Sequence, residues 1–204
     1  MTENEIRKLD GTAAFIKASY PHESTVGIVL GSGIGNLARE IDIEFQVEYS
    51  RIPDFPIATV KGHSGELIFG RMGGKRVVAM AGRFHFYEGY AVDQVVFPVR
   101  LMKKLGVKTL LLSNAAGGMN KTFRVGDLMM ITDHIGLFTV NPLIGTNNET
   151  LGPRFPDMSE PYKKQLIQKA KAIAGETGIE VKEGVYAGVT GPSFETRAEY
   201  KLLH

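Results

Sequence analysis

Several features that would assign the chain to a special class of protein are missing from its 204 residues. There is no cysteine, so the chain can form no disulfide bond and offers no thiolate ligand for zinc. Neither sign of charge predominates, because 24 lysines and arginines stand against 22 aspartates and glutamates. The basic residues are spread along the sequence instead of forming the patch typical of nucleic-acid-binding proteins. We therefore expect a cytoplasmic protein with no nucleic-acid partner.

Long apolar segments are missing as well. No apolar run approaches the roughly 20 residues that a membrane-spanning helix needs. The first residues, MTENEIRKLDG, lack the basic start and apolar core of a signal peptide. Hydrophobic residues make up 43% and charged residues 23%, which are ordinary values for a globular protein. These values predict a soluble protein with no membrane partner, folded as a single domain over residues 1–204.

Short β-branched runs alternate with helical patterns, which is typical of α/β proteins. The runs that predict strands cover residues 26–30, 76–80, 108–113, 127–132 and 181–189. The segments with helical spacing of apolar residues are 3–19, 91–105 and 161–177. Residues 72–75, MGGK, lie between two strand-like runs (67–71 and 76–80), as the turn of a tight antiparallel hairpin would. We predict a mixed central β-sheet flanked by helices in three layers.

Two segments depart from this alternation. Residues 136–160 form a long irregular stretch, and a loop of this length in a compact domain is usually functional or part of an interface. The last residues, TRAEYKLLH, begin like a helix, because Thr196 and Glu199 have capping-box spacing. No glycine, asparagine or proline ends this helix. The pattern predicts a chain that is cut short at its C-terminus.

The glycine-rich segment GSGIG, residues 31–35, follows a predicted strand and precedes the helical pattern NLAREI. Backbone N–H groups, the Ser32 hydroxyl and a helix N-terminus could converge there on one anion. A plain strand-to-helix turn is the alternative. A dinucleotide oxidoreductase, with Glu48 as its acidic residue, is a third possibility. Asn36 stands where the dinucleotide fingerprint would have its last glycine, which counts against nicotinamide cofactors.

The segment GRFHFYEGY, residues 82–90, lies at the carboxyl end of a predicted strand, where α/β proteins bind ligands. Arg83 can bind phosphate with two hydrogen bonds, and His85 points the same way along an extended backbone. The pair predicts a phosphate or carboxylate site. The alternative is a surface arginine with a histidine that only satisfies its own hydrogen bonds and aromatic rings that fill the core.

Two further strand ends carry candidate residues. SNAAGGMN, residues 113–120, is built of small residues that let backbone approach a ligand, although they also suit close packing. In TGPSFETRAEY, residues 190–200, Phe194 offers a ring for stacking and Glu195 offers two acceptors for a flat ligand edge that bears N–H groups. This combination indicates purine recognition. The alternative for Glu195 is a carboxylate in the first turn of a helix, favoured by the helix dipole.

Taken together, these segments resemble the trimeric purine nucleoside phosphorylases that prefer 6-oxopurines. The resemblance runs from about residue 20 to residue 204. Its most specific pieces are GSGIGNL, GRFHFYEGY, NAAGGMN, GDLMMITDHI, RFPDMS and GPSFETRAE. It implies a mixed sheet flanked by helices, assembly as a ring of three subunits, and phosphorolysis of inosine, guanosine and their deoxy forms to free base and pentose 1-phosphate. It implies no cofactor and no metal.

The resemblance also assigns site residues position by position. The phosphate contacts are Ser32, His63, Arg83, His85 and the backbone of Ala115. The ribose and base contacts are Tyr87, Phe194, Glu195 and Phe155, the last being lent to a neighbouring subunit's sugar. His85 and Glu195 are the expected catalytic residues, since His85 favours the phosphate dianion and Glu195 accepts from the purine N1–H. From its pattern alone, His63 is equally a structural histidine, like His134 beside Asp133.

Three elements of the family have no counterpart in this sequence. They are a Met-Ser-Thr strand, an asparagine for the purine N7 and a histidine for the 5′-hydroxyl. Two rivals follow. One is a fragment that binds nucleoside or phosphate with impaired catalysis, and the other is methylthioadenosine phosphorylase, which shares the fold. Glu195 and Ser32 favour the oxopurine enzymes over the latter.

Overall fold

The computed structural model describes residues 2–31, 34–57 and 65–204. The chain divides into two compact units, Met1–Ala115 and Ala116–His204, and each is described by itself below. The expectation of a single domain over the whole chain stays a prediction.

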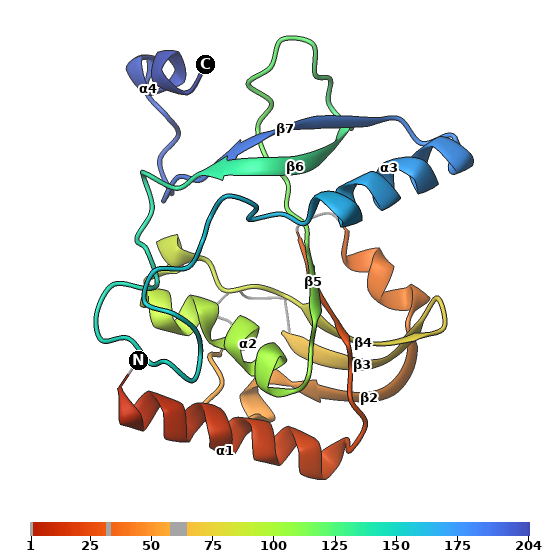
Figure 1. Ribbon diagram of the computed structural model, residues 1–204, viewed down its shortest axis with the longest axis vertical. Coiled ribbons are helices and arrows are strands. Elements are labelled where there is room, and N and C mark those ends of the chain that lie inside the picture. Colours follow the sequence, from red (N-terminus) through yellow and green to blue (C-terminus); the bar gives the residue numbers. More distant parts are fainter. Residues whose placement is uncertain (1, 32–33, 58–64) are drawn as a thin grey trace. The chain divides into compact units, whose positions relative to one another are not determined.

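Unit 1 is built on a five-stranded mixed sheet (Figure 1). Its strands, in spatial order, are β2 (Asp42–Glu48), β3 (Glu66–Met72), β4 (Lys75–Ala81), β1 (Val26–Leu30) and β5 (Thr109–Leu112). β1 runs parallel to both β4 and β5, whereas β3 runs antiparallel to both β2 and β4. Gly73 and Gly74 turn the β3–β4 hairpin with φ values of 54° and 73°, which glycine adopts readily.

The two faces of this sheet bury different residues. On one face lies a buried cluster of Ile28, Leu30, Ile41, Ile68, Val77 and Ala79, against which Ala38 of the 3₁₀-helix η1 (Gly35–Glu40) packs. Gly27, next to Ile28, faces the other way, because a Cβ built on it would lie 2.8 Å from the Met102 sulfur in α2 (Val92–Lys104). The alternation therefore places a layer on each side of the sheet.

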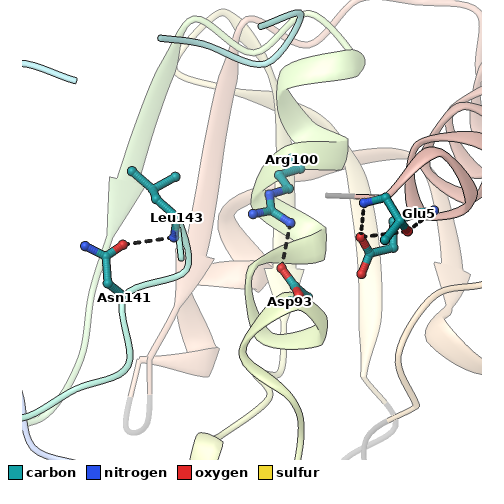
Figure 2. A network of polar contacts seen from close by, with 6 residues as sticks. Glu5, Asp93, Arg100, Asn141 and Leu143 are labelled. Carbon is teal, nitrogen blue, oxygen red and sulfur yellow. Dashed lines mark hydrogen bonds and ion pairs between the residues drawn. The ribbon is translucent and has the colours of Figure 1, made fainter. Parts of the chain in front are cut away.

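Helix α1 (Glu3–Ser19) runs beside α2 (Figure 1). Its N-terminus is closed by a capping box, in which the Glu5 N–H donates to Thr2 Oγ1 and the Thr2 N–H donates to Glu5 Oε2. In α2, Arg100 donates to Asp93 at 3.1 Å (Figure 2). The first contact closes the N-terminus of α1 and the second runs along α2, while Leu9, Ile16 and Leu101 fill the interior.

A carboxylate joins the end of α1 to the antiparallel strands. Tyr20, the C-cap of α1, donates its hydroxyl to Glu44 in β2. The same carboxylate accepts from Arg71 at 2.9 Å and from Arg76 at 3.3 Å. These hydrogen bonds, that from Tyr20 first, lower the pKa of Glu44 to about 2. Glu44 therefore stays ionised at any physiological pH.

Unit 2 consists of two parallel strands and two helices (Figure 1). β6 (Leu128–Ile135) pairs with β7 (Val181–Ala187), and α3 (Lys164–Thr177) connects toward β7. α4 (Arg197–Leu203) begins at Thr196, whose hydroxyl accepts from the Glu199 N–H in the predicted capping box. Residues 136–160 carry no helix or strand, which confirms the predicted irregular segment.

The predicted fold class is confirmed, and the helices and strands lie where the patterns placed them. Two local expectations differ from the structure. The pattern NLAREI predicted a helix, and η1 is a 3₁₀-helix of six residues. β2 was not predicted, although Ile43, Phe45 and Val47 alternate with polar residues as in a strand that buries one face. Within the described part of the chain, no helix is long and apolar enough to cross a membrane.

Candidate active site

Three parallel strands of unit 1 end side by side. Leu30 of β1 pairs with Ala81 of β4, and Val29 pairs with Leu112 of β5. The segments that follow these strands begin at Gly31, Gly82 and Ser113 and therefore leave the same edge of the sheet. This edge is where ligands bind in α/β proteins. The structure thus brings three of the predicted site segments together.

The first and third of these segments are in direct contact. The Gly31 N–H donates to Ser113 Oγ at 3.0 Å, and this hydroxyl donates to the Val29 carbonyl at 2.9 Å. A Cβ added to Gly31 would lie 2.3 Å from the Ser113 carbonyl oxygen. Glycine is therefore required here because the two backbones touch. Ser113 joins the ends of β1 and β5 and is a residue that sequence analysis did not single out.

Buried aromatic rings anchor the second of these segments, residues 82–90. Phe84 is 5% exposed and packs against Tyr49 at 5.3 Å and Tyr90 at 5.4 Å between ring centroids. The Tyr49 hydroxyl donates to the Gly82 carbonyl at 2.8 Å, and burial raises the pKa of Tyr49. The aromatic residues of GRFHFYEGY thus have divided roles: Phe84 anchors the segment, while Arg83 and His85 on either side remain partly exposed.

His85 is held by a carboxylate that sequence analysis missed. Its Nδ1 lies 2.5 Å from Glu88 Oε1, and the His85 N–H donates to the same oxygen at 3.3 Å. The Glu88 side chain is only 9% exposed, whereas the imidazole is 31% exposed. The His85 ring stacks on Tyr87 at 5.0 Å. Because Nδ1 faces Glu88, Nε2 is the nitrogen left for a ligand. The signal in the sequence was the three-residue spacing, which suits a capping box.

The structure describes only some of the other residues that were predicted to contact phosphate. Ala115 is exposed in the segment after β5, and its carbonyl accepts from the Asn114 side chain at 3.1 Å. Ser32 and His63 lie outside the described residues, so their predicted roles stay predictions. Arg83, His85, Tyr87 and Ala115 all belong to unit 1, at or near the shared sheet edge.

The predicted base and sugar residues belong to unit 2. Phe194 is 92% exposed and Phe155 is 87% exposed, which is unusual for rings of this size. Glu195 precedes the Thr196 cap of α4 and is partly buried. The acid in the first turn of α4 is Glu199, which fills the capping box. Glu195 lies one residue before the N-cap and so outside the first turn, where the alternative interpretation placed it.

His134 has a structural neighbour, in agreement with its interpretation from the sequence. Its ring meets the Tyr162 ring edge to face at 5.7 Å between centroids, and its backbone N–H donates to Asp133 Oδ1 at 2.8 Å. A cavity of about 320 Å³ in unit 1 is lined by Tyr20, His22, Ser24 and Phe69 among others, and none of the predicted site residues contributes to it. Among the residues that the structure describes, no three side chains form a metal-binding cluster. The idea of a single pocket that joins strand ends of both units stays a prediction.

A family model described as the phosphorylase superfamily matches residues 25–204. The fold and the site therefore define the chain as a phosphorylase-type protein. Purine nucleoside phosphorylase 1 of Geobacillus stearothermophilus is 52% identical over 195 residues, which are 96% of this chain and 71% of that protein. The chain belongs to the purine nucleoside phosphorylase family.

Solved structures agree with this assignment. Schistosoma mansoni purine nucleoside phosphorylase in complex with inosine matches with a TM-score of 0.91 and 43% identity, covering 97% of this chain and 71% of that chain. Other structures of the Schistosoma enzyme hold hypoxanthine or adenosine. A further purine nucleoside phosphorylase structure holds ribose 1-phosphate.

Proposed function

We propose that the chain catalyses phosphorolysis of purine ribonucleosides and deoxyribonucleosides. Inorganic phosphate attacks C1′, the bond from C1′ to the base breaks, and free purine and pentose 1-phosphate form. The observation that carries this proposal is the set of ligands in the related structures: inosine is the substrate of this reaction, and hypoxanthine and ribose 1-phosphate are its products.

Phosphate would bind at the carboxyl edge of β1, β4 and β5. Arg83 would hold it with charge-assisted hydrogen bonds, and the Nε2 nitrogen of His85 would face it because Glu88 holds Nδ1. Ser32, His63 and the backbone of Ala115 complete the proposed set. The short contact between Gly31 and Ser113 supports this location, because it draws two of the three segments together at one edge.

The sugar and the base would bind the remaining predicted site residues. Tyr87, which is 52% exposed, and the exposed ring of Phe155 would cover the pentose. Phe194 would pack on the purine and Glu195 would accept its N1–H. As the bond to the base breaks, C1′ becomes positively charged and the base leaves as an anion. A phosphate dianion beneath C1′ stabilises that charge, which is the reason for a cationic site on one side of the sugar.

Glu195 determines the proposed preference for inosine and guanosine. Hypoxanthine and guanine carry a hydrogen on N1, whereas adenine presents a lone pair there to the carboxylate. A site built to hydrogen-bond one group rejects an analogue that lacks it by on the order of 10⁴-fold. The Schistosoma relative has been solved with adenosine, so the preference has to be measured as turnover instead of binding. Cleavage of adenosine at a rate comparable to inosine would refute the role of Glu195.

We also propose a homotrimer in which Phe155 reaches the sugar site of a neighbouring subunit, and a cytoplasmic location. The exposure of Phe155 in a long loop without secondary structure supports the first point. The absence of cysteine fits the second. Analytical ultracentrifugation of the chain, with and without inosine and phosphate, tests the trimer.

The decisive experiment follows hypoxanthine release from inosine, with and without phosphate. The unmodified chain should release hypoxanthine only with phosphate, and Arg83→Ala should lose this phosphate-dependent release. Arg7→Ala is a matched control, because Arg7 is an exposed arginine of α1 away from the proposed site. Thermal stabilisation by inosine without hypoxanthine release would indicate binding without turnover. Faster cleavage of methylthioadenosine than of inosine would favour the rival phosphorylase.

A further inference from the structure

A single arginine holds the long irregular loop of unit 2. Arg154 Nη1 donates to the Leu143 carbonyl at 2.9 Å and to the Gly145 carbonyl at 2.7 Å. These bonds span 11 and 9 residues of sequence, so they close the segment between 143 and 154 into a loop. A planar guanidinium suits this task, because its fixed N–H groups reach two carbonyls at once.

The residues that Arg154 joins are themselves exposed. Leu143, Gly145 and Arg154 all lie at the surface of the chain. Local contacts add to the two bonds, such as the Leu143 N–H donating to the Asn141 side chain at 2.9 Å (Figure 2). Asn147 reaches the Gly152 carbonyl only at 3.4 Å. The two bonds from Arg154 are therefore shorter than this second connection across the loop.

The same guanidinium contacts the neighbouring aromatic ring. The Arg154 Cζ lies 5.8 Å from the centroid of Phe155, within the range of a cation–π contact. Phe155 is nonetheless 87% exposed. One side of the ring is thus backed by a cation that is itself tied to the loop, and the rest of the ring is turned to solvent.

We propose that Arg154 is the positioning residue for Phe155. This inference rests on the proposed function, in which Phe155 covers the pentose. By holding the loop at residues 143 and 145 and backing the ring, Arg154 fixes the ring orientation before the nucleoside arrives. A ring that is ordered in advance loses less conformational freedom on binding, so the nucleoside binds more tightly.

The test compares steady-state kinetics of Arg154→Met, Arg154→Lys, Phe155→Ala, the double variant Arg154→Met/Phe155→Ala, and Arg7→Met as a matched control. Arg154→Met should raise KM for inosine about 10-fold, the ratio expected for about 1.4 kcal/mol. KM for phosphate should stay unchanged. Arg154→Lys should recover only part of the loss, because an ammonium lacks the planar fork. In the Phe155→Ala background the Arg154→Met change should have little further effect.

Three results would overturn the proposal. They are an unchanged KM for inosine in Arg154→Met, an equal rise in KM when Phe155 is already alanine, and a parallel rise in KM for phosphate. Amide hydrogen exchange of residues 141–152 gives a readout that needs no turnover, and Arg154→Met should speed it. No hypoxanthine release by the unmodified chain would count against the proposed function, and unchanged exchange would then still refute the role of Arg154.

Discussion

Replacing Gly31 by alanine tests whether contact between two backbones builds the proposed phosphate site. The added Cβ would lie 2.3 Å from the Ser113 carbonyl oxygen, 2.7 Å from its carbon and 2.8 Å from the Asn114 Cα. All three are backbone atoms, so no side chain can rotate away. To reach 3.0 Å, the segment after β5 would have to move from Gly31 by about 0.7 Å. Such a shift would also stretch the hydrogen bond from the Gly31 N–H to Ser113 Oγ.

The size of the effect follows from measured costs of overpacking. Forcing extra atoms into a well-packed site costs about 1–3 kcal/mol. For a chain of this length, that corresponds to a decrease in Tm on the order of 5 °C. Because the displaced segments carry the proposed phosphate contacts, KM for phosphate should rise more than KM for inosine. Thermal unfolding followed by circular dichroism, with kinetics on the same preparation, measures both quantities.

Gly35→Ala is the matched control. Among the described residues, no heavy atom outside its chain neighbours and its own helix backbone lies within 4 Å of a Cβ built on Gly35, although it sits in the same glycine-rich segment. The Tm of Gly35→Ala should stay close to that of the unmodified chain, because the free energy of unfolding should change by less than about 1 kcal/mol. If Gly31→Ala were as stable as Gly35→Ala and bound phosphate normally, the argument from backbone contact would be wrong.

Three further predictions concern the anchors of the site and of the sheet. Tyr49→Phe should lower the free energy of unfolding by about 1 kcal/mol in urea titration, because the Gly82 carbonyl loses its buried donor; an unchanged midpoint would contradict this. Glu44 has a folded-state pKa of about 2 against 4.5, so the stability it contributes is present above pH 4.5 and is lost as pH falls through about 2. Glu44→Gln should flatten acid unfolding over that window, and an unaltered pH profile would refute the role of the carboxylate. Glu88→Ala should lower kcat/KM for phosphate about 10-fold, because Glu88 orients the His85 ring. Glu88→Gln should lose less, because its amide oxygen can still accept from His85 Nδ1. Equal activities of the two variants and the unmodified chain would exclude this role of Glu88.

The candidate site was predictable only in part. Arg83, His85 and the glycine-rich segment stand at the ends of apolar strands, and that local pattern is visible in the sequence. Glu88 was visible only as a spacing, since nothing in the sequence says that its carboxylate faces the imidazole. Tyr49 and Ser113 could not be found in this way, because their partners lie 33 and 82 residues away along the chain.

The sequence by itself determined the elements that depend on neighbouring residues. The apolar runs located β1 and β4, the glycine pair fixed the hairpin between β3 and β4, and Thr196 with Glu199 marked the start of α4. Tertiary structure alone decided the elements that depend on distant partners. β2 alternates Ile43, Phe45 and Val47 with polar residues, but its place at the edge of the sheet depends on its pairing with β3, and the site edge exists because β1 lies between β4 and β5. Local preferences act between adjacent residues, whereas these contacts form only when the whole sheet assembles.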